Sequence, residues 1–567
     1  MTAQGPTPGP TTASPAAGAE QSASLQGRGS LAIFLSSFVF PLALTQFIAS
    51  YAGSAMNVAI SEIAQDLNTT TRGIQTAITL FTLTMAALMI PGSKVTDIIG
   101  RKRCLMLGLA IYGTGGLIAS LAQSLGVLIV GYSLLEGIGS ALMIPPIYII
   151  LTVAFSDVTS RAKAFGMVSA AAGLGAAAGP LIGGLITSAL SWRASFLVQV
   201  IVVGGIIFMG RKFQGGSGQR MPFDIVGSVL SASGLIFVVL GILQSGTYGW
   251  LTATKDVVIG DRVVIEEGGI SPVWPLMAIG ALLLTWFFFH IRSRERAGKE
   301  PLLSTRLFRN RTSNLGLVTQ NVQWLTMQGS FFVVSVFLQT VRGYSAIETG
   351  LILTASTIGI LLSSALAGRM ARRRSQAILI RGGFILNIGG SLLLLLISDA
   401  TSEIWAFLPG LFLMGFGIGI MLTASVNVVQ SSFPEKDQGE ISGLSRSASN
   451  LGSSLGTALV GSVLVSSRFV DNSAYAAALI VMVGIGVVGL LAAWMLPSDA
   501  GQTPDAAAPG DDGAPTAHAV TVDGAGPAPS STPPERADRG ISTIDQPFRK
   551  SANHQGDPSR YTLFATR

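Results

Sequence analysis

One ionisable side chain lies deep within an apolar stretch of the sequence. Glu136 follows about ten residues of the apolar segment Val127–Phe155, so on a helix it would lie roughly 15 Å from the nearer end. We find no lysine or arginine at a matching depth, since Arg381 and Arg446 stand near the ends of their own apolar segments. A carboxyl group in such a place is expected to be neutral much of the time and to exchange a proton. The alternative is a neutral Glu136 that only hydrogen-bonds a neighbouring helix.

Catalytic and metal chemistry have no comparable candidates. The chain has one cysteine, Cys104, and three histidines, of which His518 and His554 stand in a polar terminal stretch. These residues assemble into no nucleophile with a neighbouring base and no cluster of metal ligands. We therefore expect a protein that is not an enzyme and that has no cofactor or metal.

The composition indicates which solvent surrounds this chain. Of its 567 residues, 49% are hydrophobic and only 11% are charged, and the mean hydropathy is +0.57. Soluble proteins carry about 25% charged residues, so a chain this apolar must place most of its surface in lipid. The net charge of +7 does not indicate nucleic-acid binding, because the basic residues stand in short loops between apolar segments.

About fourteen apolar segments are long enough to cross a bilayer as helices. They are Leu31–Ile60, Gly73–Val95, Cys104–Gln123, Val127–Phe155, Ala162–Leu190, Ala194–Met209, Ile225–Leu243, Val273–His290, Leu315–Val341, Gly350–Met370, Ile378–Ile397, Ile404–Val429, Leu444–Val465 and Ala474–Leu496. The sequence thus predicts an all-α integral membrane protein. We expect disorder over 1–30, a six-helix bundle over 31–211, two inserted helices with an external loop or β-hairpin over 212–297, a second six-helix bundle over 298–497, and a disordered tail over 498–567.

Charged residues in the loops indicate the orientation. Arg101-Lys102-Arg103, the run from Arg292 to Arg311, and Arg372-Arg373-Arg374 all fall on one side of the predicted membrane, whereas the other side holds few cations. The positive-inside rule therefore places both termini in the cytoplasm of a multi-pass protein of the cell membrane. We expect a monomer whose partners are the lipid bilayer and a small molecule.

Small residues are regularly spaced in the fifth apolar segment. Gly175, Gly179 and Gly183 are four residues apart and would share one helix face, against which another helix can pack closely. Pro180 removes a backbone donor beside this face, and Gly184 follows it. The simplest interpretation is a helix-packing motif.

Taken together, these features resemble the fourteen-helix drug:proton antiporters of the major facilitator superfamily, over about residues 31–496. The turn with Asp97, Gly100, Arg101 and Lys102 is similar to the superfamily signature, and the stretch 175–184 matches the antiporter motif at every fixed position. The resemblance implies two six-helix bundles with two additional central helices. It also implies that the Asp97 turn latches the bundles together on the cytoplasmic side, and that the smooth face of the fifth helix lets them seal and slide.

Two charged positions of that family are not charged here. Ala52 stands where an acid is usual, and Ser133 stands where an arginine is usual, whereas Glu136 replaces an expected glutamine. Glu136 is therefore the candidate for proton coupling, and a proton is the expected second partner.

Polar residues of the first and ninth apolar segments are candidates to line a cavity between the bundles. They are Tyr51, Asn57, Gln320, Asn321, Gln323 and Gln328. The alternative for each of them is a hydrogen bond that joins neighbouring helices.

The predicted function is export of amphiphilic or hydrophobic small molecules by alternating access, coupled to protons and typical of multidrug efflux. One alternative is an exporter of an endogenous metabolite or lipid, or an uncoupled facilitator, with the same fold. A second alternative is a membrane sensor that transports nothing.

Overall fold

The computed structural model describes residues 39–155, 158–211, 213, 222–259, 262–371, 374–399, 401–434, 437–466, 472–498 and 500. The helices described below all belong to one compact unit within residues 1–506. The terminal segments 1–30 and almost all of 498–567, for which the sequence predicts disorder, lie outside the described residues.

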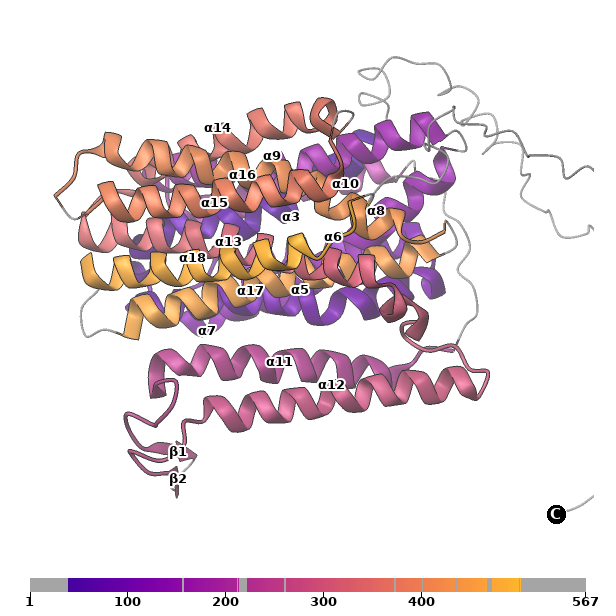
Figure 1. Cartoon of the computed structure of the whole chain (residues 1–567), viewed down its shortest axis with the longest axis horizontal. Coiled ribbons are helices and arrows are strands. Elements are labelled where there is room, and N and C mark those ends of the chain that lie inside the picture. The colour runs from indigo at the N-terminus through magenta and orange to yellow at the C-terminus, as the bar shows by residue number, and fades with distance from the viewer. Residues whose placement is uncertain are drawn as a thin grey trace, which may run out of the picture. The chain divides into compact units, whose positions relative to one another are not determined.

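Six long helices make up the first half of the membrane unit, which we define as residues 39–210 (Figure 1). Two of them change helix type along their length. In order they are α3 (Val39–Ala55) with η1 (Met56–Ala59) and α4 (Ile60–Asp66); α5 (Thr71–Ile99); α6 (Arg101–Ser120); α7 (Leu125–Leu128) with the π-helical η2 (Ile129–Glu136) and α8 (Gly137–Ala154); α9 (Val158–Ala189); and α10 (Trp192–Gly210).

Two helices follow the first half. They are α11 (Ile225–Tyr248) and α12 (Val273–Arg296), and the antiparallel strands β1 (Val257–Ile259) and β2 (Arg262–Ile265) lie between them. The two strands pair with each other and thus form a β-hairpin. Figure 1 shows α11 and α12 side by side, and α11 also packs against α5 and α17.

The second half, residues 311–494, again contains six long helices. The short η3 (Thr305–Arg309) precedes it. Its elements are α13 (Arg311–Val336) with η4 (Phe337–Val341), α14 (Ala346–Ala371), α15 (Gln376–Ile397), η5 (Ile404–Ala406) with α16 (Phe407–Ser431), α17 (Gln438–Ser466) and α18 (Asn472–Trp494).

Thirteen helices within the described residues are long and apolar enough to cross a membrane. The fourteenth long helix, α17, has 29 residues but is rich in serine and carries Glu440 and Arg446. It packs between α13 and α5, so its polar side chains face protein rather than lipid. The predicted all-α membrane fold with fourteen helices is therefore confirmed.

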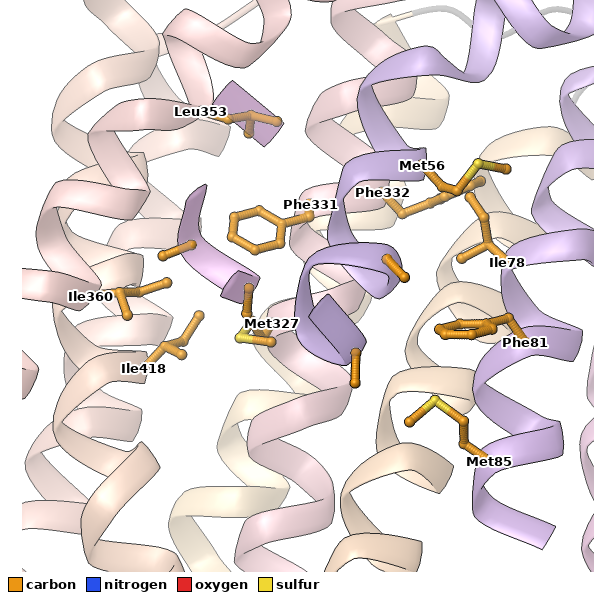
Figure 2. Packing of buried hydrophobic residues seen from close by; sticks show 14 of the residues in the cluster. Met56, Ile78, Phe81, Met85, Met327, Phe331, Phe332, Leu353, Ile360 and Ile418 are labelled. Carbon is orange, nitrogen blue, oxygen red and sulfur yellow. The ribbon is translucent and has the colours of Figure 1, made fainter. Parts of the chain in front are cut away.

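The two halves meet along two pairs of helices, α5 with α17 and α9 with α14. A continuous apolar core extends through both halves. Figure 2 shows part of it, to which η1 and α5 contribute Met56, Ile78, Phe81 and Met85, and α13, α14 and α16 contribute Met327, Phe331, Phe332, Leu353, Ile360 and Ile418. Close packing thus continues from one half into the other across the interface between them.

Candidate functional site

Helices from both halves enclose a cavity of about 50 Å³. The first half contributes residues of α3, α5, α8 and α9, and the second half contributes residues of α13 and α17. Its wall combines apolar groups, such as Phe81 and Trp324, with neutral polar groups, such as Gln46 and Asn450. A site that encloses a drug-sized molecule needs about 300–1,000 Å³, so the cavity is too small for one in this conformation.

The structure brings only one of the six predicted cavity residues to this wall. Gln328 lines the cavity, and its Nε2 donates to the carbonyl oxygen of Gly53 in the other half at 3.1 Å. Gln320 and Asn321 instead bond α17, through Ser449 and the carbonyl oxygen of Ala448, both at 2.8 Å.

The other three predicted cavity residues also lie elsewhere. The Tyr51 hydroxyl bonds Ser195 Oγ of α10 at 2.7 Å, and Asn57 Nδ2 donates to the carbonyl oxygen of Ser54 at 3.2 Å. Gln323 is buried, and its amide has no partner within the part of the chain that the structure describes. For Tyr51 and Asn57 the alternative of bonds within and between neighbouring helices agrees better with the structure than a cavity role does, whereas Gln323 shows neither.

One cavity residue, Arg446, was not among the residues predicted to line the cavity, because in the sequence it stands near the end of an apolar segment. It lines the cavity, where its guanidinium carbon lies 5.1 Å from the centre of the Tyr148 ring and Nη2 donates to the Tyr148 hydroxyl. The predicted apolar segment begins at Leu444, but α17 begins at Gln438, so Arg446 is more than two turns into the helix. The polar residues just before Leu444 are compatible with a helix, and they could have indicated that the helix begins before its apolar stretch.

Glu136 does not line the central cavity. It ends the π-helical segment η2 and is fully buried inside the first half, facing α6. Gly115 and Gly116 make room for it, since a Cβ atom added at Gly116 would lie 3.0 Å from Glu136 Oε1. Neither carboxyl oxygen has a hydrogen-bond partner among the described residues.

Two tyrosine side chains, Tyr112 and Tyr132, lie near enough to this buried carboxyl group to interact with it electrostatically. The Tyr112 hydroxyl donates to Gln199 Oε1 at 2.5 Å, and Gln199 Nε2 donates to the carbonyl oxygen of Ser195 at 3.3 Å. A chain of polar groups therefore links α6 and α10 beside Glu136.

The two positions that lack the usual charges are bonded within the first half. Ser133 Oγ donates to the carbonyl oxygen of Ala77 at 2.7 Å, and the Tyr132 hydroxyl donates to the carbonyl oxygen of Ala52 at 3.3 Å. Neither position therefore brings a charge to the cavity or to Glu136.

The glycine motif of α9 serves two different contacts. A Cβ atom added at Gly175, Gly179 or Gly183 would overlap Phe47, Ser54 or Ala55 of α3, respectively. This face therefore packs inside the first half. The contact with α14 is made instead by Gly184, where an added Cβ would lie 2.5 Å from the carbonyl oxygen of Ala346.

Pro180 also contributes to the contact between α9 and α14. Its carbonyl oxygen would lie 2.5 Å from a Cβ atom added at Gly350 of α14. The expectation that the three-glycine face seals the two halves is thus corrected, since Pro180 and Gly184 make that contact.

The predicted latch residues lie around the turn between α5 and α6. Asp97 falls in the last turn of α5, and Gly100 makes the turn with a φ of 91°. Lys102 Nζ donates to the carbonyl oxygens of Arg211 and Phe213, at 2.8 and 2.5 Å, and so holds the end of α10. Arg101 begins α6 and interacts electrostatically with Asp97.

The ion pair that joins the halves at this end involves a neighbour of the predicted residues. Lys94 Nζ lies 2.8 Å from Glu440 Oε1 of α17, and Glu440 Oε2 accepts from the backbone N–H of Ser304 at 3.1 Å. Asp97 lies close enough to interact electrostatically with both Lys94 and Glu440. Sequence reasoning missed Lys94 and Glu440, because nothing local pairs two residues so far apart in the chain.

Comparisons with known proteins agree with this architecture. The family model of the Major Facilitator Superfamily matches residues 42–213, 225–457 and 317–534. The chain is 26% identical to the multidrug resistance protein Stp of Mycobacterium tuberculosis, over 72% of each chain. It is 27% identical to the puromycin resistance protein pur8 of Streptomyces alboniger, over 74% of this chain and 79% of that one.

A solved structure supports the same fold. The crystal structure of a peptide transporter, POT, in complex with sulfate superposes with a TM-score of 0.60 at 13% identity, over 84% of this chain and 98% of that chain.

Proposed function

The chain belongs to the Major Facilitator Superfamily, and is thus a membrane transporter rather than an enzyme; from this premise we propose that it exports amphiphilic or hydrophobic small molecules by alternating access. The observation that carries the proposal is a cavity between two six-helix halves, with contacts between the halves on either side of it. Relatives named for multidrug and puromycin resistance support a drug-like substrate.

Contacts between the halves occur at both ends of the helices. At the end that carries the α5–α6 turn, which we call the basic end, Lys94 pairs with Glu440. At the opposite end, the backbone N–H of Ile347 donates to Ser188 Oγ at 3.0 Å, and that of Ser61 donates to Gln339 Oε1 at 3.0 Å. Because the cavity holds only about 50 Å³, a substrate can enter only after one of these sets of contacts has opened.

The proposed orientation follows from the basic residues. Arg101, Lys102 and the cations between Arg292 and Arg311 are all at the basic end, which in our proposal faces the cytoplasm. Both termini are then cytoplasmic, and the transporter resides in the cell membrane and works as a monomer.

In this proposal, proton entry drives export and Glu136 is the proton carrier. Its carboxyl group is fully buried and has no partner in the described part of the chain, so it is stable only in the neutral form. If water reaches the carboxyl group when the first half rearranges, the free-energy cost of ionising it falls. The π-helical segment that ends at Glu136 is a helix irregularity of the kind that often accompanies functional sites.

The test is transport by purified protein in proteoliposomes with an imposed pH gradient. The substrate is whichever of puromycin and a panel of amphiphilic antibiotics the unaltered protein carries fastest. Glu136→Gln keeps the neutral shape and cannot release a proton. We expect gradient-driven accumulation to fall at least tenfold, while exchange of the same substrate without a gradient persists. Glu348→Gln, at an exposed carboxylate, is the matched control and should behave as the unaltered protein.

Each outcome decides a different point. Undiminished accumulation by Glu136→Gln would exclude Glu136 as the coupling residue. If neither puromycin nor any of a panel of amphiphilic antibiotics crosses the membrane through the unaltered protein, the exporter function itself is contradicted, and the sensor alternative is favoured.

One observation favours an uncoupled facilitator as the second candidate. Glu136 lies inside the first half rather than at the cavity, and Arg446 is the one charged residue among the described cavity residues. Substrate and proton would therefore have to communicate through helix movement rather than by competing for one carboxylate. Equal exchange rates with and without a pH gradient in the same proteoliposomes would favour this candidate.

A further inference from the structure

We propose that the central cavity recognises anionic amphiphiles, and that Arg446 is the residue that binds their acidic group. This inference rests on the proposed exporter function and names its substrate class. The cavity binds an apolar molecule that bears a carboxylate or a similar acid in preference to a lipophilic cation.

The charge balance of the cavity is the first argument. Within the described residues, Arg446 is the one charged side chain in the wall, and no aspartate or glutamate lines it. Among the described residues the one fully buried acid, Glu136, faces α6 inside the first half rather than the cavity. A bound cation would therefore face a positive charge and meet no negative one.

Within the part of the chain that the structure describes, Arg446 has no anionic partner. Its contacts there are with Tyr148, whose ring lies 5.1 Å from the guanidinium carbon and whose hydroxyl accepts from Nη2. A guanidinium group stays charged and carries five N–H donors, most of which a single hydroxyl leaves unused. A charged group in the wall of a cavity between helices is costly unless it is paired, so an entering anion would gain from binding there.

The rest of the wall suits the other parts of such a molecule. Phe81, Trp324 and Met327 provide apolar and aromatic surface for its body. Gln46 is 2% exposed, and its Oε1 has no partner in the described part of the chain, so it can accept a hydrogen bond from a ligand hydroxyl. The pattern of one guanidinium, neutral amides and aromatic rings fits an aromatic acid.

The competing explanation is that Arg446 only ties the halves together through Tyr148. The two explanations differ in what the charge does. If the bond to Tyr148 were the whole role, Tyr148→Phe would reproduce the effect of Arg446→Gln for every substrate. If Arg446 binds an anion, Tyr148→Phe keeps the aromatic ring and the preference for anions.

The experiment compares two dyes on the same xanthene scaffold, fluorescein as the anion and rhodamine 6G as the cation. Purified protein in proteoliposomes is given a pH gradient, and the dye taken up is measured after filtration and lysis at one fixed pH. We expect the unaltered protein to transport fluorescein at least tenfold faster than rhodamine 6G. Arg446→Gln should remove this preference by slowing fluorescein at least tenfold, whereas Arg446→Lys should slow it only a few-fold.

The outcomes separate this inference from the exporter function. Transport of rhodamine 6G as fast as fluorescein by the unaltered protein overturns the inference and leaves the exporter function standing, and this comparison needs no variant to fold. An equal loss for both dyes in Arg446→Gln and Tyr148→Phe assigns Arg446 to the contact between the halves and also overturns it. Failure of both dyes to move contradicts the exporter function on which it depends.

Discussion

A single carboxylate, Asp224, ties three segments together at the basic end. It precedes α11 and is 4% exposed, and its Oδ1 accepts from the backbone N–H of Gly227 at 3.0 Å and lies 2.9 Å from His290 Nε2 of α12. Its Oδ2 accepts from the backbone N–H of Leu302 at 3.2 Å and lies 3.5 Å from Arg294 Nε. The inserted helices are thereby attached to the segment that leads into the second half.

The ionisation of Asp224 follows from these contacts. Burial raises the pKa of its carboxyl group, but the hydrogen bonds from His290 and Gly227 and the charges of His290 and Arg294 outweigh burial and hold it below its usual 3.8. Because the folded-state pKa is the lower one, the stabilisation is fully present above about pH 4 and is lost as the pH falls through the folded value.

Asp224→Asn should therefore destabilise the protein in a pH-dependent way. We expect a loss of about 1–3 kcal/mol at neutral pH, as for other hydrogen bonds to charged groups. The difference from the unaltered protein should shrink below about pH 4. Thermal unfolding in detergent between pH 3 and pH 7 measures this, with Glu267→Gln, at an exposed carboxylate that follows β2, as the control. A difference that stays constant over this range would contradict the assignment.

At the scale of elements, α9 is the helix that holds the first half together and also meets the second half. Its glycines at 175, 179 and 183 let α3 approach backbone to backbone, while Gly184 admits α14. The first contact is expected to stay closed in every conformation, because it is internal to one half. The second lies between the halves and must change if they rock.

Two glycine substitutions in α9 should therefore have different effects. Gly175→Ala overpacks the contact with α3 and should destabilise the protein by about 1–3 kcal/mol whichever conformation it adopts. Gly184→Ala should shift the population towards a conformation in which α9 and α14 are further apart. Thermal unfolding measures the first effect, and the distance between spin labels at the exposed positions Leu190 and Glu348 measures the second.

Gly173→Ala is the matched control, since an added Cβ at Gly173 would meet nothing within 4 Å. Identical distance distributions for Gly175→Ala and Gly184→Ala would show that the two faces of α9 do not have separate roles.

At the scale of the whole transporter unit, many weak contacts join the halves. Single side chains donate to backbone carbonyls across the interface, as Ser447 Oγ does to Ala86 at 2.6 Å and Gln75 Nε2 does to Thr457 at 3.1 Å. Each such bond contributes about 0.5–1.5 kcal/mol. Because these bonds are individually weak, such an interface can open on one side at a modest free-energy cost, as the proposed alternating access requires.

The ion pair Lys94–Glu440 should bias which side opens. Lys94→Glu places two acids together and should open the basic end, which lengthens the distance between spin labels at the exposed positions Arg103 and Ser431. Adding Glu440→Lys should restore most of the original distance, because the pair is re-formed with reversed charges. The restoration is partial, since Glu440 also accepts from Ser304. Equal distances in the single and double variants would show that the pair does not hold this end closed.

Much of the fold could be predicted from the sequence, because whether a segment can span a bilayer depends only on the length and hydropathy of that segment. Apolar segments of bilayer length, separated by basic turns, predicted fourteen helices, and the motifs at 97–102 and 175–184 indicated the family. The depth of Glu136 could be predicted in the same way, since a residue's position along a helix is a property of that helix alone.

Only the tertiary structure decided which way these helices face. In a membrane protein, the sides that face lipid and the sides that face other helices are both apolar, so periodicity does not distinguish them. Glu136 therefore faces the interior of one half, and five of the six predicted cavity residues lie away from the cavity wall. Arg446 reaches the cavity because α17 begins before its apolar stretch, supported by contacts with α5 and α13 that no local pattern encodes.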